Sequence, residues 1–288
     1  MTPTLAIIGG SGLYAMKDVT VRERVTVDTP FGATSGPVEL GDLGGVPVAF
    51  LARHGAGHRL LPTEVPYRAN LWALKSLGVR AVLSFSAVGS LQAQHAPGTL
   101  RLPDQFIDRT AGRPSTFFGE GLVAHVALSD PTCPMLRARL LEAGRACGLP
   151  IEDGGTYVCM EGPEFSTRAE SRLHQSWGAD YIGMTQATEA KLAREAELCY
   201  ATVALVTDYD SWREAEPGAD GADIFATISA NIEKSRQLLR QVVPSLAEIP
   251  ACGCQQALKT ALVTPPERVP EATLRKLALL VERYGYRG

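Results

Sequence analysis

Two aspartates, Asp208 and Asp210, follow the most strongly apolar run of the sequence, residues 200–206, with Tyr209 between them. A carboxyl group that is partly buried keeps its proton to a higher pH, so it can act as a general acid toward a heterocyclic leaving group. A second carboxylate nearby can accept hydrogen bonds from the polar edge of the same ring. In a solvated turn the two carboxylates would do neither, and the pair alone leaves both interpretations open.

The segment Gly9-Gly10-Ser11-Gly12 and the side chain of Arg53 both indicate anion binding. Backbone N–H groups of a glycine turn, together with the Ser11 hydroxyl, can cradle an anion, and arginine donates to phosphate in a bidentate manner. The segment matches neither the G-x-G-x-x-G fingerprint nor the G-x4-G-K-[ST] loop. An anion site without lysine or metal indicates free phosphate as a substrate, since nucleoside triphosphates usually bring Mg²⁺ and a phosphate-binding lysine.

Polar or glycine-rich clusters follow five predicted strands. They lie at residues 9–12, 53–55, 86–90, 183–185 and 207–210. Each cluster alone could be an ordinary polar turn. Ligands of α/β folds bind at the carboxyl ends of strands, so five clusters together favour one shared pocket.

The elements that position these clusters alternate between strand and helix. Apolar runs predict strands at 5–8, 46–52, 81–85, 156–160, 181–182 and 200–206, and helical spacing predicts helices at 64–77, 134–147, 167–177, 188–196, 222–243 and 271–283. Ser166 is the expected N-cap of the third helix. This alternation predicts an α/β fold with a mixed central sheet flanked by helices.

The 288 residues, 45% of them apolar, suffice for a large core. We expect one domain at 1–263, with a proline-containing linker and a helix at 264–288 packing on the same domain. Charged residues are 20% and the net charge is −3, which argues against a nucleic-acid partner. No membrane segment is apparent, and residues 1–12 lack a signal-peptide pattern, so we expect a soluble cytoplasmic protein.

Six cysteines are scattered along the chain, apart from the pair in Cys252-Gly253-Cys254. Zinc sites usually show C-x2-C pairs, repeated or joined by histidines, and neither spacing occurs. The sequence therefore predicts no metal site. The cysteines are expected to be buried thiols in a reducing compartment, or else Cys252 and Cys254 form a redox-sensitive pair.

Ordered segments along nearly the whole chain resemble one family. They include IIGGSGLY (7–14), ARHGAGH (52–58), YRANLWALK (67–75), SAVGSL (86–91), YVCMEGPEFSTRAES (157–171), GADYIGMT (178–185) and CYATVALVTDYDSW (199–212). The sequence resembles the 5′-methylthioadenosine phosphorylases of the trimeric purine nucleoside phosphorylase family, from Ile7 to about Leu246. The resemblance implies a nucleoside phosphorylase-like fold and a transferase that acts in purine and methionine salvage. In this reaction phosphate attacks C1′ of methylthioadenosine, giving adenine and 5-methylthioribose 1-phosphate.

The resemblance also implies roles for individual residues. Asp208 and Asp210 would be catalytic, with Asp208 protonating purine N7 and Asp210 accepting from the 6-amino group. The phosphate site would comprise Ser11, Arg53, His54, Ser86, Ala87 and Thr185. The nucleoside site would comprise Phe165, Met184, His58, Ile224, Phe225 and His125, the last from a neighbouring subunit. No cofactor is implied beyond inorganic phosphate as co-substrate, and a homotrimer or hexamer is expected. The C-x-C pair is similar to one in thermophilic relatives, where disulfides occur.

Two departures from the family pattern lie beside the sugar and base sites. Gly183 stands where the human-type enzyme has asparagine, although many bacterial relatives also have glycine there. Gln186-Ala187-Thr188 follows Thr185, so Thr188 precedes Glu189 where the family usually has a proline.

Four other functions remain open from the sequence. A 6-oxopurine or methylthioinosine phosphorylase is disfavoured by the aspartate pair, and a hydrolytic nucleosidase by the phosphate-matching residues. A non-catalytic nucleoside sensor is disfavoured because the full set of acid and phosphate-site residues is present. A dinucleotide-dependent dehydrogenase is disfavoured because the glycine spacing does not match its fingerprint.

Overall fold

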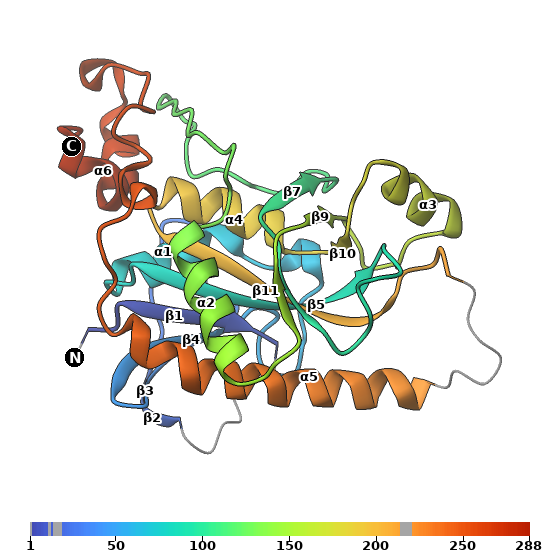
Figure 1. The fold of residues 1–288 in the computed structure, drawn as a ribbon. Helices are drawn as coiled ribbons and strands as arrows, with labels where there is room; N and C mark the ends of the chain where they lie inside the picture. The colour runs from blue at the N-terminus through green and yellow to red at the C-terminus, as the bar shows by residue number, and fades with distance from the viewer. Residues whose placement is uncertain (1, 11–12, 14–18, 214–220) are drawn as a thin grey trace.

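The computed structural model describes residues 2–10, 13, 19–213 and 221–288, without the side chains of 221–224 (Figure 1). The strands are β1 (Leu5–Gly9), β2 (Thr20–Val25), β3 (Val38–Leu43), β4 (Val46–Ala52), β5 (Ala81–Ser90), β6 (Leu100–Leu102), β7 (Gln105–Asp108), β8 (Ile151–Asp153), β9 (Thr156–Cys159), β10 (Tyr181–Gly183) and β11 (Cys199–Tyr209). The α-helices are α1 (Tyr67–Ser76), α2 (Pro134–Ala146), α3 (Arg168–Ser176), α4 (Gln186–Glu195), α5 (Gly221–Val242) and α6 (Glu271–Val281).

Within this part of the chain the strands form one mixed sheet. Its main path runs β2-β3-β4-β1-β5-β10-β9-β7, and β11 pairs with β5 and β6. Strand β1 is parallel to β4 and to β5, and β11 is parallel to β5, whereas β10 is antiparallel to β5. The predicted mixed sheet is thereby confirmed, and the carboxyl ends of β1, β4, β5 and β11 lie at one edge of the sheet.

Helices cover both faces of the sheet (Figure 1). On one face, Ile7 and Leu83 share a buried cluster with Leu136 of α2 and Leu239 of α5. On the other face, alternate residues of the same strands share a cluster with side chains of α1, α4 and α6, among them Leu71 and Leu192. Side chains alternate along a strand, so each central strand is buried on both sides and is almost wholly apolar.

Two central strands extend beyond their predicted ends. β5 continues through Ser90 and β11 through Tyr209, so the predicted polar cluster at 86–90 and all but Asp210 of the cluster at 207–210 lie inside strands. The ladder between them shifts register, since Val206 pairs with Val88 but Asp208 pairs with Gly89. Thr207 is the extra residue of this bulge, and a bulge redirects the side chains that follow it.

Some local expectations were wrong. The N-cap of α3 is Thr167, whose hydroxyl accepts a hydrogen bond from the Glu170 backbone N–H in a capping box; it is not Ser166. β2, β3, β6, β7 and β8 were not predicted. β2 lies at the edge of the sheet with mostly exposed side chains, so its sequence lacks the apolar signal of a buried strand.

The C-terminal segment contributes to the main core. Leu274 and Leu277 of α6 belong to the same buried cluster as Trp72 of α1. Leu262 forms a β-bridge with Ala124, which ties this segment to the long connection before α2. None of the helices in the described ranges combines the length and the apolar character needed to cross a membrane.

Candidate active site

A cleft of about 630 Å³ lies at the carboxyl ends of the central strands. Its lining comes from the segments after β1 and β4, from the second halves of β5 and β11, and from β10 with the residues around it. The lining residues are Gly10, Arg53, His54, His58, Pro62, Phe85, Ser86, Ala87, Val88, Gly89, Met160, Phe165, Ile182, Gly183, Met184, Thr185, Thr207, Asp208, Tyr209, Asp210, Ser211 and Ile228. The five predicted clusters therefore each contribute to one cavity.

Ten of the fourteen predicted site residues line this cleft. They are Arg53, His54, His58, Ser86, Ala87, Phe165, Met184, Thr185, Asp208 and Asp210. Ser11 lies outside the described residues, as does the side chain of Ile224.

The other two predicted residues lie elsewhere on the chain. His125 is exposed and does not line the cleft of its own chain, and its backbone N–H donates to the Ala261 carbonyl. Phe225, in the first turn of α5, is 72% exposed and also lies outside the cleft lining, which Ile228 of the same helix joins instead.

Arg53 forms the cationic base of the cleft. It directly follows β4, and its side chain is 3% exposed. Its Nε pairs with Glu189 Oε1, Nη2 donates to Ser84 Oγ at 2.6 Å, and Nη1 donates to the Phe85 carbonyl at 2.9 Å. A buried guanidinium held by this many acceptors has a fixed orientation, so its charge is presented to the cleft from a defined point.

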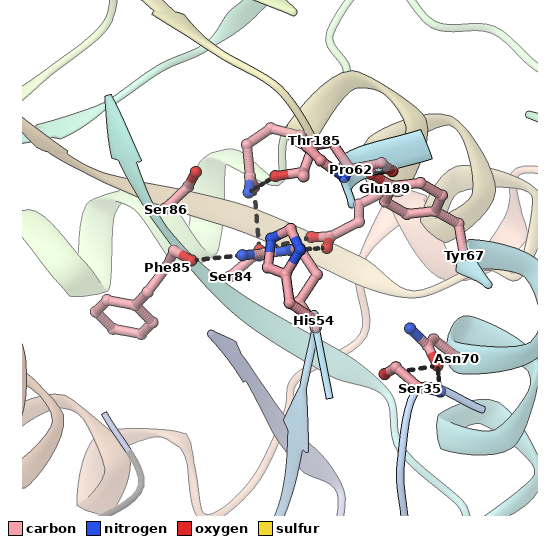
Figure 2. Close-up of polar contacts among 12 residues, drawn as sticks. Ser35, His54, Pro62, Tyr67, Asn70, Ser84, Phe85, Ser86, Thr185 and Glu189 are labelled. Atoms are coloured by element: carbon pink, nitrogen blue, oxygen red, sulfur yellow. Dashed lines mark hydrogen bonds and ion pairs between the residues drawn. The ribbon is translucent and has the colours of Figure 1, made fainter. Parts of the chain in front are cut away.

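A buried polar network continues from Glu189 into the sheet. Glu189 Oε2 accepts from Ser84 Oγ at 2.6 Å and from the Tyr200 hydroxyl at 2.9 Å. Gln186 Nε2 donates to Thr185 Oγ1 at 3.0 Å, linking the network to the lining. Figure 2 shows the side chains of Ser86, Thr185 and His54 grouped around Glu189 and Ser84. Hydroxyls of the lining and the buried Arg53 cation thus lie in the same part of the cleft, and this set of groups can bind an anion.

His54 is neutral and has a defined tautomer. Its Nδ1 lies 2.8 Å from the Leu60 carbonyl oxygen, which only accepts hydrogen bonds, so Nδ1 carries the proton and Nε2 is an acceptor. Burial and the positive charge of Arg53 lower the pKa of His54 to about 4. The ring stacks on His58 with a centroid separation of 4.2 Å. A neutral His54 can therefore accept a hydrogen bond from a ligand hydroxyl at Nε2 rather than add charge to the anion site.

Asp208 has the properties of a proton donor. Burial raises its pKa, and the nearby Asp210 carboxylate raises it further, against the lowering effect of a hydrogen bond from Thr207. Thr207 Oγ1 donates to Asp208 Oδ1 at 2.6 Å. Since Oδ1 accepts this bond, Oδ2 is the oxygen available to carry a proton toward the cleft. The bulge at Thr207 thus supplies both the direction of Asp208 and its hydrogen-bond donor.

Asp210 presents a buried carboxylate oxygen that lacks a protein partner. The residue is 6% exposed, and no described residue donates a hydrogen bond to its Oδ2 atom. A buried acceptor left without a donor is rare and indicates a missing ligand or water. The backbone N–H of Asp210 donates to Ser90 at 2.9 Å and fixes its position. This oxygen is suited to accept from an N–H group of a bound molecule.

Gly183 leaves space that Tyr157 fills. A Cβ at position 183 would meet the Tyr157 hydroxyl and would lie 2.7 Å from Cζ of the same ring, which is fully buried. The glycine that departs from the human-type pattern is therefore paired with a tyrosine that occupies the space of its side chain. The next residue, Met184, is held by its carbonyl, which accepts from Arg113 Nη1 at 2.6 Å.

The apolar part of the cleft is open to solvent. Phe165 lines it while remaining 82% exposed, so a flat ligand would cover a large aromatic surface there. Ile182, Met184 and Ile228 complete the apolar lining.

Several residues that shape the site were given no role from the sequence, although Gln186 was noted as a departure from the family pattern. Glu189 and Gln186 anchor the arginine network, Arg113 holds Met184, and Thr207 donates to Asp208. One signal was present for the first two: α4 is short and rich in alanine, and its polar residues at 186 and 189 share one helix face. Arg113 gave no such signal, because it lies in an irregular segment.

Comparison with known proteins places the chain in a family. The family model of the phosphorylase superfamily matches residues 4–244. An S-methyl-5′-thioadenosine phosphorylase of Koribacter versatilis is 51% identical over 284 residues, which cover 99% of this chain and 97% of that protein. The enzyme of the same name from Gloeobacter violaceus is 52% identical over 285 residues, covering 97% and 95%.

Solved structures agree with the sequence relatives. A methylthioadenosine phosphorylase from an antarctic soil metagenomic library superposes with a TM-score of 0.93 at 48% identity, covering 97% of this chain and 99% of that one. A mutant adenosine/methylthioadenosine phosphorylase of Schistosoma mansoni, in complex with methylthioadenosine, has a TM-score of 0.82 at 34% identity, covering 89% and 96%. The chain therefore belongs to the phosphorylase superfamily and, within it, to the S-methyl-5′-thioadenosine phosphorylases.

Proposed function

We propose that this protein catalyses the reversible phosphorolysis of 5′-methylthioadenosine to adenine and 5-methylthioribose 1-phosphate. The observation that carries the proposal is the pairing of two unlike carboxyl groups at one end of the cleft. Burial raises the pKa of Asp208, and Asp210 offers a buried acceptor to which no residue in the described part of the chain donates. An anion pocket formed by Arg53 and neighbouring hydroxyls lies at the other end.

The two ends of the cleft match the charges that develop in the reaction. Cleavage of the glycosidic bond builds positive charge on the ribosyl ring and negative charge on the purine. Phosphate beneath the ring stabilises the first, and a proton from Asp208 to purine N7 relieves the second. Both interactions strengthen toward the transition state, which is the condition for accelerating the step.

The bonds, electrons and protons of this reaction balance without a cofactor. One phosphate oxygen forms a bond to C1′ as the bond from C1′ to the purine nitrogen breaks, and the electron pair leaves with the base. The proton that Asp208 delivers neutralises that base. We propose inorganic phosphate as the only co-substrate, held by Arg53, His54, Ser86, Ala87 and Thr185, with Ser11 expected beside them.

Base selectivity follows from the acceptor at Asp210. The 6-amino group of adenine donates N–H bonds, which Asp210 Oδ2 can accept. The 6-oxo oxygen of a 6-oxopurine is also a hydrogen-bond acceptor, so neither it nor Asp210 Oδ2 would find a donor. An unpaired buried acceptor costs roughly 1–3 kcal/mol. The apolar lining, which includes Ile228, suits a thioether that donates no hydrogen bond.

The position of His125 supports an oligomeric enzyme. His125 is exposed and is not among the lining residues of its own cleft, while Val123 in the same connection is 43% exposed. We propose that the chain acts in the cytoplasm as a homotrimer or a hexamer built from trimers, in which His125 completes the 5′ end of a neighbouring cleft.

A substrate panel tests the proposed reaction. Release of free base is measured from methylthioadenosine, adenosine and methylthioinosine, each with and without phosphate. Fastest release from methylthioadenosine, dependent on phosphate, is the expected result. Phosphate-independent release would move the protein to the hydrolases, faster turnover of methylthioinosine would refute the base assignment, and binding without turnover would indicate a sensor.

A further inference from the structure

Four cysteines from three separate segments bring their sulfur atoms together. The Sγ atoms of the four residues all lie within 4.8 Å of one another. Cys133 is the N-cap residue of α2 and Cys199 begins β11, whereas Cys252 and Cys254 belong to the C-terminal segment. All four are free thiols in the structure, as are Cys147 and Cys159. The C-x-C pair thus has two partners that its own spacing does not reveal.

The separation of the sulfur atoms fits tetrahedral metal coordination. The Sγ atoms of Cys133 and Cys252 are 3.7 Å apart. Zinc–sulfur bonds of about 2.3 Å in a regular tetrahedron place the sulfur atoms about 3.8 Å apart. A disulfide requires a separation of about 2.05 Å. One pair of sulfur atoms therefore already has the spacing of a four-thiolate site, and all four lie within 4.8 Å of one another.

Three of the four cysteines in the cluster are shielded from water. Cys133, Cys199 and Cys254 are buried, and Cys252 is partly exposed beside a shallow cavity that also contains Lys75 and Arg80. Without a ligand, the three buried thiols and Cys252 contact one another only through weak S–H hydrogen bonds. The partly exposed Cys252 provides a path by which an ion could reach the interior.

The surroundings stabilise negative charge on sulfur. Gln255 Nε2 donates to Cys199 Sγ at 3.7 Å, and Arg80 Nη2 donates to Gln255 Oε1 at 2.7 Å. Such outer hydrogen bonds orient and stabilise metal-bound thiolates.

We propose that Cys133, Cys199, Cys252 and Cys254 bind one Zn²⁺ in a tetrahedral, structural site. Binding releases the four thiol protons and forms four zinc–sulfur bonds, with no change of oxidation state. The four thiolates leave no open coordination position, so the ion has no catalytic role. Its function is to hold the segment that contains Cys252 and Cys254 against the start of α2 and the start of β11. The prediction of no metal rested on spacing within single segments, a criterion that does not apply to ligands from three segments.

The alternative for the same four sulfur atoms is oxidation to two disulfides. Zinc binding and disulfide formation are mutually exclusive for a given cysteine, and they differ in two measurable quantities. A zinc site gives one metal ion per chain and six thiols after denaturation in chelator. Two disulfides give no metal and two thiols.

The test is metal and thiol analysis of the full-length protein, purified without chelator and supplied with Zn²⁺ during expression. We expect about one zinc per chain by mass spectrometry of the metal content and six titratable thiols. Cys254→Ser and Cys252→Ser are expected to lose most of the bound zinc, whereas Cys147→Ser, outside the cluster, retains it. No bound zinc, iron in its place, two thiols instead of six, or equal zinc in all variants would each overturn the proposal.

A second measurement, on the wild-type protein, tests the site even if the cysteine variants do not fold. Zinc is removed from the wild-type protein and Co²⁺ is added, which produces strong visible bands only in tetrahedral thiolate coordination. A stoichiometric rise of these bands, reversed by Zn²⁺, is expected, and no such bands would also refute the site. Neither measurement depends on the proposed phosphorolysis, so the two proposals can fail separately.

Discussion

Glu189 of α4 pairs with the guanidinium of Arg53 beneath the anion pocket, and both side chains are almost fully buried. Removing one member of a buried ion pair leaves the other charge uncompensated, which costs about 3–5 kcal/mol. We therefore expect Glu189→Gln to lower the free energy of unfolding by about that amount, measured by urea denaturation. The control is Glu248→Gln on the surface, expected within about 0.5 kcal/mol of wild type. Equal stability of the two variants would contradict a supporting role for Glu189.

Arg53 itself should matter for phosphate more than for the nucleoside. Arg53→Ala removes the cation at the base of the cleft and is expected to raise the KM for phosphate more than the KM for methylthioadenosine. Steady-state kinetics with each substrate varied in turn makes the comparison, and Arg22→Ala, in the exposed strand β2, is the matched control. An unchanged KM for phosphate would remove Arg53 from the phosphate site.

Asp208 should act on the leaving group. Asp208→Asn keeps the size of the side chain but cannot deliver a proton, so we expect kcat to fall by roughly 10²–10⁴-fold, with little change in the KM for phosphate. In the wild type, activity should decline as pH rises through the raised pKa of Asp208, and the variant should lack this decline. The pH profile of kcat provides the measurement, with Asp28→Asn as an exposed control. Wild-type turnover in Asp208→Asn would refute the assignment.

Asp210 should set the preference for a 6-amino group. Asp210→Asn supplies a donor where the wild type has only an acceptor, so it can pair with a 6-oxo group. We expect the ratio of kcat/KM for methylthioadenosine to that for methylthioinosine to fall by about 10- to 100-fold, corresponding to a hydrogen bond of about 1.5–3 kcal/mol with a charged group. The two substrates are compared on the same enzyme preparation. An unchanged ratio would mean that Asp210 does not contact the base.

Gly183 should tolerate no side chain while Tyr157 is present. Gly183→Ala forces the new Cβ against the buried ring, and overpacking of this kind costs typically about 1–3 kcal/mol. Gly36→Ala, where no atom lies within 4 Å of the new Cβ, is the control. Tyr157→Phe removes the closest atom, so the double variant should recover part of the loss in a double-mutant cycle. Purely additive effects would show that the two positions do not compete for space.

Glu195, at the end of α4, should make stability depend on pH. Burial raises its pKa from 4.5 to about 7, although it accepts hydrogen bonds from Thr116 and from the Phe117 backbone. Between these values the folded chain binds the proton that the unfolded chain has lost, so this residue lowers stability as pH rises from 4.5 to 7. Glu195→Gln does not titrate, so its stability relative to wild type should increase over this window by up to about 3 kcal/mol. A difference that stays constant with pH would contradict the shift.

The parts of the site that could be predicted are those whose signal is local. Apolar runs of four to seven residues indicated the central strands, and the clusters after them located the cleft because parallel strands end at one edge. The extension of β5 through Ser90 could not be predicted, since Ser86 and Gly89 give no apolar signal, and their pairing is made by the neighbouring strand.

Other features depend on contacts between distant residues. The buried ion pair joins residues 136 positions apart, and the thiol cluster draws on three segments. The exposure of Phe225 could not be read from its residue type either, since it depends on where α5 lies relative to the cavity. The position of His125 outside its own cleft lining was expected, but only from the family resemblance.

The paired register of β5 and β11 fixes the distance between the anion pocket and the base end of the cleft. Ser86, beside the anion pocket, pairs with Ala204, while Gly89 pairs with Asp208 at the base end. Three residues of extended chain span about 10 Å, and the ladder of backbone hydrogen bonds holds that length. An inhibitor that joins a phosphate mimic to a purine mimic should therefore gain most from a rigid linker cut to this span, and lose affinity when the linker is shortened or made flexible.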